Sequence, residues 1–475
     1  MTGSLLYTVC LLTIACHEGF GKSALRGMFP DKYPPMKQNG VDPGQPVFLT
    51  PYIEQGQFKQ AMEASKVGPI EGVDQTSYAG FITVNKTYNS NMYFWFFPAQ
   101  NKPESAPVLV WLQGGPGGSS LFGLFVENGP YLVNKDIKFV KKDITWNSKY
   151  SMLYIDNPVG TGFSFTDKDE GYARNEVDVA RDLYSCLTQF FQVFNQLQNN
   201  SFFVTGESYA GKYVPAISYK IHEENKQLFP KVRINLQGLA IGDGLCDPET
   251  MMIQYADFMY NIGMLDEEQR DYFQGYAKTA VQYIQKKEFG KAFDIFDMLI
   301  LGGPGSFVGN VTMAEDYYNF LRTKAPADFD YYGTALADPE IRKAIHVGNL
   351  TYHAGTEVEK HIINDIMDTV KPWVATLMDN YRVMMYTGQL DIIVAIPLTE
   401  AFLMTVPWSG LEQYKAAGRL VWRIHSNDTE VAGYVRNVNN FYQVIVRGGG
   451  HILPYDQPAR SFDMIDRFIN DKGFA

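Results

Sequence analysis

Six short runs of continuous apolar residues constrain the fold more than any other feature of this chain. They lie at 108–112, 152–155, 202–205, 239–241, 383–386 and 444–446. Apolar runs of this length are typical of strands buried on both faces, as in a parallel sheet covered by helices. Two more runs, 81–84 and 92–97, flank Asn- and Ser-rich turn residues and predict an antiparallel hairpin. We therefore expect an α/β fold with a mixed, mostly parallel central sheet.

Helical patterns separate these runs. Residues 176–194 place five side chains on a single stripe, namely Val177, Ala180, Leu183, Tyr184 and Leu187. The longest interruption, 248–338, combines acidic residues at 266–268 with apolar residues at helical spacing. It predicts a mostly helical cap inserted between two parts of one core, 21–247 and 339–475. The first part begins with a Pro- and Gly-rich stretch to about residue 72, which predicts an extended leader and surface loop.

Composition excludes several classes of protein. The chain has 475 residues, of which 45% are hydrophobic and 20% charged, as in a globular protein and unlike a disordered one. The formal net charge of −11 makes nucleic acid an unexpected partner, because phosphate-binding proteins carry a basic surface.

The N-terminus predicts entry into the secretory pathway. Residues 5–16 form an apolar segment of signal-peptide length, too short to span a membrane, so we expect a signal peptide over 1–20. The alternative is a buried N-terminal helix. No later segment is apolar for long enough to cross a membrane. Five Asn-x-Ser/Thr sequons support a secreted or lysosomal location: Asn85, Asn199, Asn310, Asn349 and Asn427. Cys186 and Cys246 remain in the mature chain, either paired or as two buried thiols.

A serine follows the run at 202–205 in the sequence Gly206-Glu-Ser208-Tyr-Ala-Gly211. A strand, a tight turn of small residues and a helix form the context of a nucleophile elbow, in which strain lifts the serine hydroxyl above the sheet. Ala210 stands where this pattern usually has glycine. The alternative is an ordinary turn with Ser208 as a helix cap.

A glycine-rich segment, 113–120, follows the run at 108–112. Consecutive glycines allow backbone N–H groups to approach a reacting carbonyl, so this is the expected position of an oxyanion hole. We expect the N–H groups of Gly115 and Tyr209 to be its donors. A phosphate-binding loop is the alternative, but the Lys-Ser/Thr ending of such loops is missing.

Two further residues complete a catalytic triad. They follow the serine in the order Ser, Asp, His, which is the order found in α/β folds with a nucleophile elbow. Asp391 follows the run at 383–386, and His451 follows the run at 444–446. Both lie where functional loops gather, at the carboxyl ends of strands. Singly, Asp391 could be a turn cap and His451 a loop histidine, but their order and position favour catalysis. We expect His346, His353 and His425 to be structural or surface residues.

These stretches resemble the serine carboxypeptidase family over nearly the whole mature chain, and most closely its vitellogenic carboxypeptidase-like branch. Three segments outside the triad also carry the resemblance: 48–53, 123–130 and 156–164. It implies an α/β-hydrolase fold. It also implies that Glu127 and Glu207 share a proton and, with Gln113 and the N–H of Gly114, hold the free C-terminal carboxylate of the substrate. Two carboxyls forced together cannot both ionise easily, so the protonated one can donate to an anion.

Three positions depart from the family pattern. Gln113 stands where asparagine is common, Gly118 where a disulfide cysteine is common, and Ile452 where methionine is common. The preferred substrate side chains therefore cannot be transferred from relatives.

The expected function is hydrolysis of the C-terminal peptide bond of peptides and proteins through an acyl-enzyme, at acidic pH. No metal and no organic cofactor are implied, and the oligomeric state is open, with a homodimer as one option. Two alternatives use the same residues. One is a carboxypeptidase-like acyltransferase or esterase, and the other is a stabilising binding partner with incidental peptidase activity.

Overall fold

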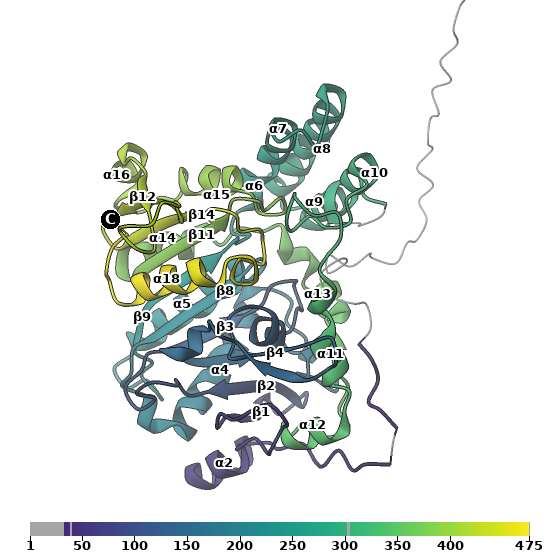
Figure 1. Ribbon diagram of the computed structural model, residues 1–475, viewed down its shortest axis with the longest axis vertical. Coiled ribbons are helices and arrows are strands. Elements are labelled where there is room, and N and C mark those ends of the chain that lie inside the picture. Colours follow the sequence, from purple (N-terminus) through teal and green to yellow (C-terminus); the bar gives the residue numbers. More distant parts are fainter. Residues whose placement is uncertain (1–32, 39, 302–304, 475) are drawn as a thin grey trace, which may run out of the picture.

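A ten-stranded mixed sheet organises this computed structural model, which describes residues 33–38, 40–301 and 305–474 (Figure 1). The predicted signal peptide, 1–20, lies outside the described residues. The strands in spatial order are β1 (Tyr78–Asn85), β2 (Ser90–Phe97), β6 (Ser151–Ile155), β3 (Val108–Leu112), β8 (Phe202–Glu207), β9 (Leu236–Gly242), β11 (Arg382–Gly388), β14 (Phe441–Val446), β13 (Gly433–Val438) and β12 (Leu420–Trp422).

The six central strands, from β6 to β14 in this spatial order, are parallel. At each edge of the sheet, two further strands pair in antiparallel fashion, each with the strand next to it. Each of the six predicted apolar runs lies in one of these central strands, and the predicted hairpin is β1–β2. The predicted α/β class with a mixed, mostly parallel sheet is confirmed. Strands β12 and β13 were not among the predicted runs.

Helices cover both faces of the sheet (Figure 1). Neighbouring side chains of β8 point to opposite faces, as the pleat of a strand requires. Phe202 packs against α4 (Glu176–Val193), whereas Phe203 packs against Phe468 in α18 (Pro458–Ile469). α5 (Ala210–Asn225) lies beside α4 and against β8 and β9. The strands are therefore buried from both sides, which explains their uninterrupted apolar sequence.

The predicted stripe of α4 is correct except at its first residue. Ala180, Leu183 and Leu187 are buried and Tyr184 is half-buried, but Val177 is 65% exposed. Successive helical residues are rotated by about 100°, so the stripe centred on the three buried residues passes through Glu176. Val177 lies at its edge, and Glu176 is buried instead.

The prediction of an extended leader is wrong between residues 50 and 64. This segment forms α1 (Thr50–Glu54) and α2 (Phe58–Ala64), and both Leu49 and Ala61 are fully buried. The N–H of Leu49 donates to the carbonyl of Phe81 in the edge strand β1, over 2.8 Å. The segment therefore covers a strand edge that would otherwise expose unpaired backbone groups.

The predicted insertion, 248–338, contains mostly helices: α6 (Pro248–Met251), α7 (Tyr255–Asn261), α8 (Glu267–Gln285), α9 (Phe289–Phe296), α10 (Phe307–Thr312) and α11 (Tyr331–Ala335). Helices α7 to α10 stand above the sheet in Figure 1. α8 begins with a capping box in which Asp266 and Gln269 each satisfy the other's backbone N–H. The division into core and cap remains a prediction.

The remaining α-helices and strands lie outside the main sheet and the insertion. They are α3 (Ser120–Phe122), α12 (Pro339–Ala344), α13 (Thr356–Ile366), α14 (Lys371–Asn380), α15 (Ile396–Leu403), α16 (Leu411–Ala416), α17 (Leu453–Asp456), and the strand pairs β4 (Tyr131–Val133) with β5 (Phe139–Lys141) and β7 (Thr161–Gly162) with β10 (His353–Ala354). Among the described residues, no helix has the length and apolarity needed to cross a membrane.

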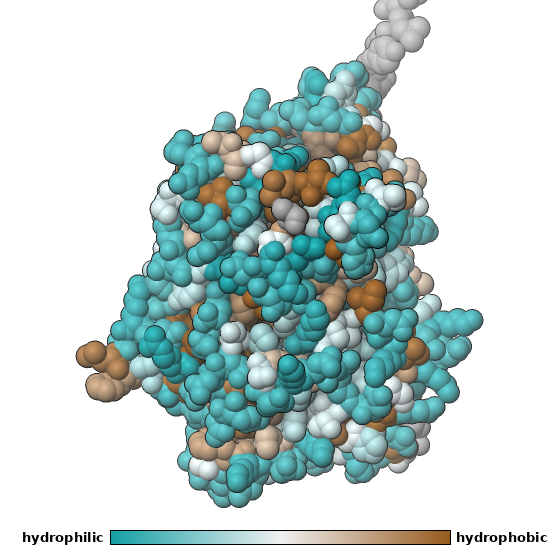
Figure 2. Space-filling model, turned by 60° about the vertical axis from the view of Figure 1, so that its left-hand side comes forward, coloured by the Kyte–Doolittle hydropathy of each residue, from teal (hydrophilic) through white to brown (hydrophobic). Residues whose placement is uncertain are grey.

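The surface is mostly hydrophilic on the face shown in Figure 2. Four sequon asparagines are exposed and Asn85 is half-buried. Their glycosylation remains a prediction. Cys186 and Cys246 are both buried and free, so of the two alternatives the unpaired thiols are confirmed.

We predict that Leu183→Ala destabilises the protein by about 2–5 kcal/mol, because it leaves a cavity between α4 and the sheet. The matched control is Val177→Ala on the same helix, which should change the free energy of unfolding by less than about 0.5 kcal/mol. Urea unfolding of both variants measures the difference. Equal losses would contradict the packing described for α4.

Candidate active site

Three loops bring the predicted triad residues to one edge of the sheet. Ser208 follows β8, Asp391 follows β11 and His451 follows β14, and these strands lie in the order β8, β9, β11, β14. The carboxyl ends of parallel strands meet at the same edge, where ligands bind in open α/β sheets.

Ser208 occupies a strained turn between β8 and α5. Its φ is 66°, in the left-handed region that costs a residue other than glycine about 1–3 kcal/mol. Three backbone bonds hold it there. Its N–H donates to the carbonyl of Gly242 (3.0 Å), and its carbonyl accepts from the N–H groups of Gly211 (2.9 Å) and Leu245 (3.0 Å). A Cβ on Gly211 would lie 2.6 Å from the nitrogen of Leu245, so the turn requires glycine here.

His451 and Asp391 form a hydrogen-bonded pair that is fully buried. Nδ1 of His451 lies 2.8 Å from Oδ2 of Asp391, and the other carboxylate oxygen accepts from the N–H of Val394 (3.2 Å). The Nε2 atom of His451 has no hydrogen-bond partner among the described residues. Because the carboxylate accepts the Nδ1 proton, Nε2 is the nitrogen with a free lone pair.

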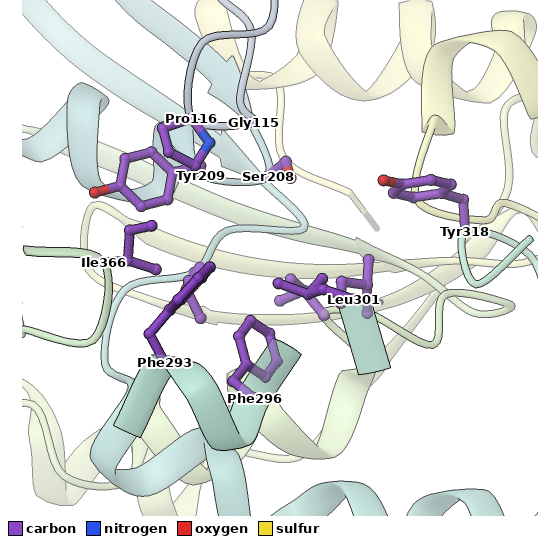
Figure 3. Close-up of a pocket in the computed structure, with 12 residues that line it drawn as sticks. Gly115, Pro116, Ser208, Tyr209, Phe293, Phe296, Leu301, Tyr318 and Ile366 are labelled. Carbon is purple, nitrogen blue, oxygen red and sulfur yellow. The ribbon is translucent and has the colours of Figure 1, made fainter. Parts of the chain in front are cut away.

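The glycine-rich segment lies directly against the serine turn. A Cβ on Gly114 would lie 2.6 Å from both the Cβ of Ser208 and the nitrogen of Tyr209. Any side chain at position 114 would therefore cover the N–H of Tyr209. Gly115 and Tyr209 line the same cleft as Ser208 (Figure 3).

Glu127 and Glu207 are buried next to this segment. The amide of Gln113 donates to Oε1 of Glu207 (3.3 Å), and the indole of Trp111 donates to Oε1 of Gln113 (2.8 Å), which fixes the amide. Burial raises the pKa of Glu127 to about 7, against the lowering effects of the neighbouring Glu207 carboxyl and of the charge of Lys142. Burial and the charge of Glu127 raise the pKa of Glu207 well above its usual range. The carboxyls of Glu127 and Glu207 therefore influence each other's ionisation.

The cleft in front of Ser208 has an apolar wall. Much of this wall comes from the insertion, and the apolar residues are Leu245, Phe293, Phe296, Leu301, Ile366, Ile393 and Val394 (Figure 3). Tyr318 lies on the other side, with its hydroxyl toward Ser208 (Figure 3). The cleft can therefore bury an apolar group beside the serine.

Residues 318–320 of the insertion connect the loops that carry His451 and Asp391, a contact that the sequence does not predict. The carbonyl of Tyr318 accepts the N–H of His451 (2.7 Å), and the N–H of Phe320 donates to the carbonyl of Leu390 (3.0 Å). The ring of Tyr318 also lies 5.1 Å from the imidazole. These bonds are made by backbone atoms in a loop, so the sequence carries no signal for them.

A second unanticipated residue is Asp243, which is fully buried beside Asp391. It directly follows β9, and the criterion that singled out Asp391, an acid at the carboxyl end of a strand, would also have found it. In the described part of the chain, Asp243, Asp391 and His451 are the one group spaced closely enough to hold a metal ion. The 2.8 Å between His451 and Asp391 is a hydrogen-bond distance, so proton sharing accounts for this cluster.

The histidines set aside in the sequence analysis lie outside this cluster. Nε2 of His346 bonds the carbonyl of Lys66 (2.8 Å), His353 lies in β10 and His425 is exposed.

Comparison with known proteins identifies the family. The family model described as serine carboxypeptidase matches residues 68–471. The chain belongs to the serine carboxypeptidase family. It is 57% identical to the probable serine carboxypeptidase CPVL of Homo sapiens (91% of each chain covered) and 43% identical to the vitellogenic carboxypeptidase of Aedes aegypti (90% of each chain covered). It is 47% identical to the venom serine carboxypeptidase of Apis mellifera, which covers 93% of this chain and 94% of that protein.

The fold is also similar to a solved structure. The crystal structure of Kex1, a prohormone-processing carboxypeptidase from Saccharomyces cerevisiae, aligns with a TM-score of 0.76 at 23% identity, over 86% of this chain and 96% of that one. The predicted family resemblance and the α/β-hydrolase fold are confirmed. The protein is a serine carboxypeptidase, a hydrolase.

We predict that Glu127→Gln becomes more stable relative to the wild type as pH rises. In the wild type, a carboxyl with a raised pKa costs stability progressively between its unfolded value, about 4.5, and its folded value, about 7. Glutamine does not titrate, so the difference in unfolding free energy should shift by on the order of 3 kcal/mol across this range. Thermal melts at several pH values, with exposed Glu104→Gln as control, measure it. A difference that is independent of pH would contradict the raised pKa.

Proposed function

We propose that this serine carboxypeptidase removes C-terminal residues through an acyl-enzyme on Ser208, with His451 as the general base and Asp391 as its orienting acid. One observation carries the proposal: a buried imidazole with Nδ1 bound to a carboxylate and Nε2 unpartnered lies at the same edge of the sheet as a strained serine. A serine needs such a base because its hydroxyl is a weak nucleophile at neutral pH.

In the proposed mechanism, Oγ of Ser208 attacks the carbonyl carbon of the last peptide bond, and its proton moves to Nε2 of His451. The carbonyl π electrons move onto oxygen, giving a tetrahedral oxyanion. When the oxyanion collapses, the C–N bond breaks and the imidazolium gives its proton to the departing amine. Water then attacks the ester by the same route and releases Ser208. The carboxylate of Asp391 keeps its hydrogen bond to Nδ1 and stabilises the positive imidazolium.

The N–H groups of Gly115 and Tyr209 are the proposed oxyanion donors. Support comes from Gly114, whose missing side chain leaves the nitrogen of Tyr209 uncovered. Donors fixed before the reaction stabilise the developing charge without reorganising.

The carboxyl pair is the proposed site for the free C-terminus of the substrate. A protonated Glu127–Glu207 pair, the amide of Gln113 and the N–H of Gly114 can all donate hydrogen bonds to a carboxylate. An ionised pair would repel it. Because Glu127 holds its proton below about pH 7, we propose that the enzyme works at acidic pH. An acidic compartment reached through the secretory pathway, lysosomal or extracellular, fits this requirement.

The insertion 248–338 is proposed to act as the cap that selects the substrate. Phe293, Phe296 and Leu301 reach the cleft from this segment. Their apolar side chains favour an apolar residue beside the cleaved bond. The peptide substrate itself is the only proposed partner, and no cofactor enters the mechanism.

We predict that Ser208→Ala lowers kcat by about 10⁶-fold, the loss seen when comparable triads lose the nucleophile. Ser218→Ala is the matched control, because Ser218 is also buried and its hydroxyl has no hydrogen-bond partner among the described residues. Mass spectrometry of a peptide ladder measures both variants. Carboxypeptidase activity in Ser208→Ala above about 1% of the wild type would reject the assignment. An ester or transfer product without peptide shortening would favour the acyltransferase alternative.

We also predict that KM for a peptide with a free C-terminus rises as pH passes through about 7, because Glu127 then loses its proton and its negative charge repels the substrate carboxylate. A peptide amide carries no anion, so its KM should be higher in acid and change little. In Glu127→Gln the rise should move to higher pH or disappear. Kinetic profiles for both peptides on both proteins make the comparison, and four superimposable profiles would exclude the pair as the source.

A further inference from the structure

Asp243 has a backbone conformation that is uncommon for residues other than glycine. It follows β9 directly, between Gly242 and Gly244, and its φ of 44° lies in the left-handed region. Its N–H donates to the carbonyl of Tyr386 in the neighbouring strand β11 (2.8 Å). Strained residues other than glycine cluster at functional sites, where the surrounding structure maintains them.

The two oxygens of this carboxyl differ in their partners. Oδ1 accepts the N–H of Gly388, over 2.8 Å. Oδ2 is buried and has no partner among the described N–H and O–H groups. Ligand atoms of Asp243, Asp391 and His451 all lie within 4.8 Å of one another. An ionised oxygen without a donor is unfavourable in such a place, whereas a protonated one can itself donate to a neighbouring carboxylate.

The surrounding charges also favour the protonated form. Burial raises the pKa of Asp243 well above its usual range, and the negative charges of Asp391 and, more weakly, Glu127 add to this effect. The other titratable groups that face it are His451, Glu207 and Tyr386. The Nδ1–H group of His451 already donates a hydrogen bond to Asp391.

We propose that Asp243 is a positioning residue of the triad. Its carboxyl stays protonated, and the O–H at Oδ2 donates a hydrogen bond to the carboxylate of Asp391. Asp391 would then accept three hydrogen bonds, from His451, Val394 and Asp243. These fix the rotation of its carboxylate and leave one negative charge on the two acids together. The inference deepens the proposed function, since it assumes that His451 and Asp391 act on Ser208.

A purely structural reading assigns Asp243 only the bond from Oδ1 to Gly388. The two readings differ in what they predict for pH. A donor to Asp391 stabilises its ionised form, so removing the donor makes Asp391 easier to protonate. The acid limb of the pH profile would then move to higher pH. Losing the bond to Gly388 alone would lower stability without moving that limb.

Two substitutions and one control test the proposal. Asp243→Asn keeps an oxygen that accepts from the N–H of Gly388, and its N–H group replaces the O–H donor to Asp391. Asp243→Ala loses both hydrogen bonds. Asp182→Ala removes another buried carboxyl, which lies on α4 and pairs with Arg181. The first readout is the pH profile of kcat and KM for one peptide with a blocked N-terminus and a free C-terminus. The second is the rate at which a fluorophosphonate labels Ser208.

We predict that Asp243→Asn stays within about threefold of the wild type across the profile, because the donor is retained. Asp243→Ala should lose at least about tenfold in kcat with little change in KM, and its acid limb should move upward by about half a pH unit or more. The labelling rate should fall in parallel with kcat. Asp182→Ala should keep its kcat within about twofold of the wild type, because Asp182 contacts none of these groups.

Three results would overturn the proposal. One is a kcat for Asp243→Ala above about a third of the wild type. Another is Asp243→Asn losing as much activity as Asp243→Ala. The third is an acid limb of Asp243→Asn that moves downward, which would mean that Asp243 is ionised and raises the proton affinity of His451. If Asp243→Ala does not fold, the Asn profile alone decides. Labelling of the wild type but not of Ser208→Ala tests the triad independently of Asp243.

Discussion

Four carboxyl side chains, Glu127, Glu207, Asp243 and Asp391, are buried near enough to one another for their charges to interact. Two unit charges 4 Å apart repel by about 4 kcal/mol in a protein-like environment, so these acids cannot all be ionised together. Burial and mutual repulsion raise the pKa values of Glu127, Glu207 and Asp243. The protons held at these acids are therefore as much a part of the site as the side chains. The same constraint links the end that binds the substrate carboxylate with the end that orients the imidazole.

Backbone strain at neighbouring strand ends is the second constraint on the site. Ser208 and Asp243 both have positive φ, after β8 and β9. The sheet supports them in sequence: the N–H of Ser208 bonds to the carbonyl of Gly242, and the N–H of Asp243 bonds to that of Tyr386. Each strained residue is thus held by the next strand in the sheet. The hydrogen bonding of the parallel strands is what maintains the geometry of the nucleophile.

Much of this arrangement could be predicted from the sequence, because the buried strands are unbroken apolar runs and Ser208, Asp391 and His451 follow three of them. Features set by long-range contacts could not. The exposure of Val177 depends on where α4 rests on the sheet, and α1 and α2 form over an edge strand that the local sequence does not reveal. The links from Tyr318 to His451 and from Phe320 to Leu390 join backbone atoms more than 60 residues apart. Asp243 could have been predicted, because it is an acidic residue at the carboxyl end of a strand, as Asp391 is.

The links made by Tyr318 and Phe320 bear on how the cleft can be redesigned. Helices α7 to α10 precede this segment, and α9 supplies Phe293 and Phe296 to the cleft wall. Exchanging these helices for those of a relative would alter the wall while leaving the backbone partners of His451 and Leu390 in place. An exchange that also replaced residues 317–320 would remove those partners. Grafts for new specificity should therefore end before residue 317. The grafted helices then form the cleft wall, and the original residues 317–320 still hold the loops of His451 and Asp391.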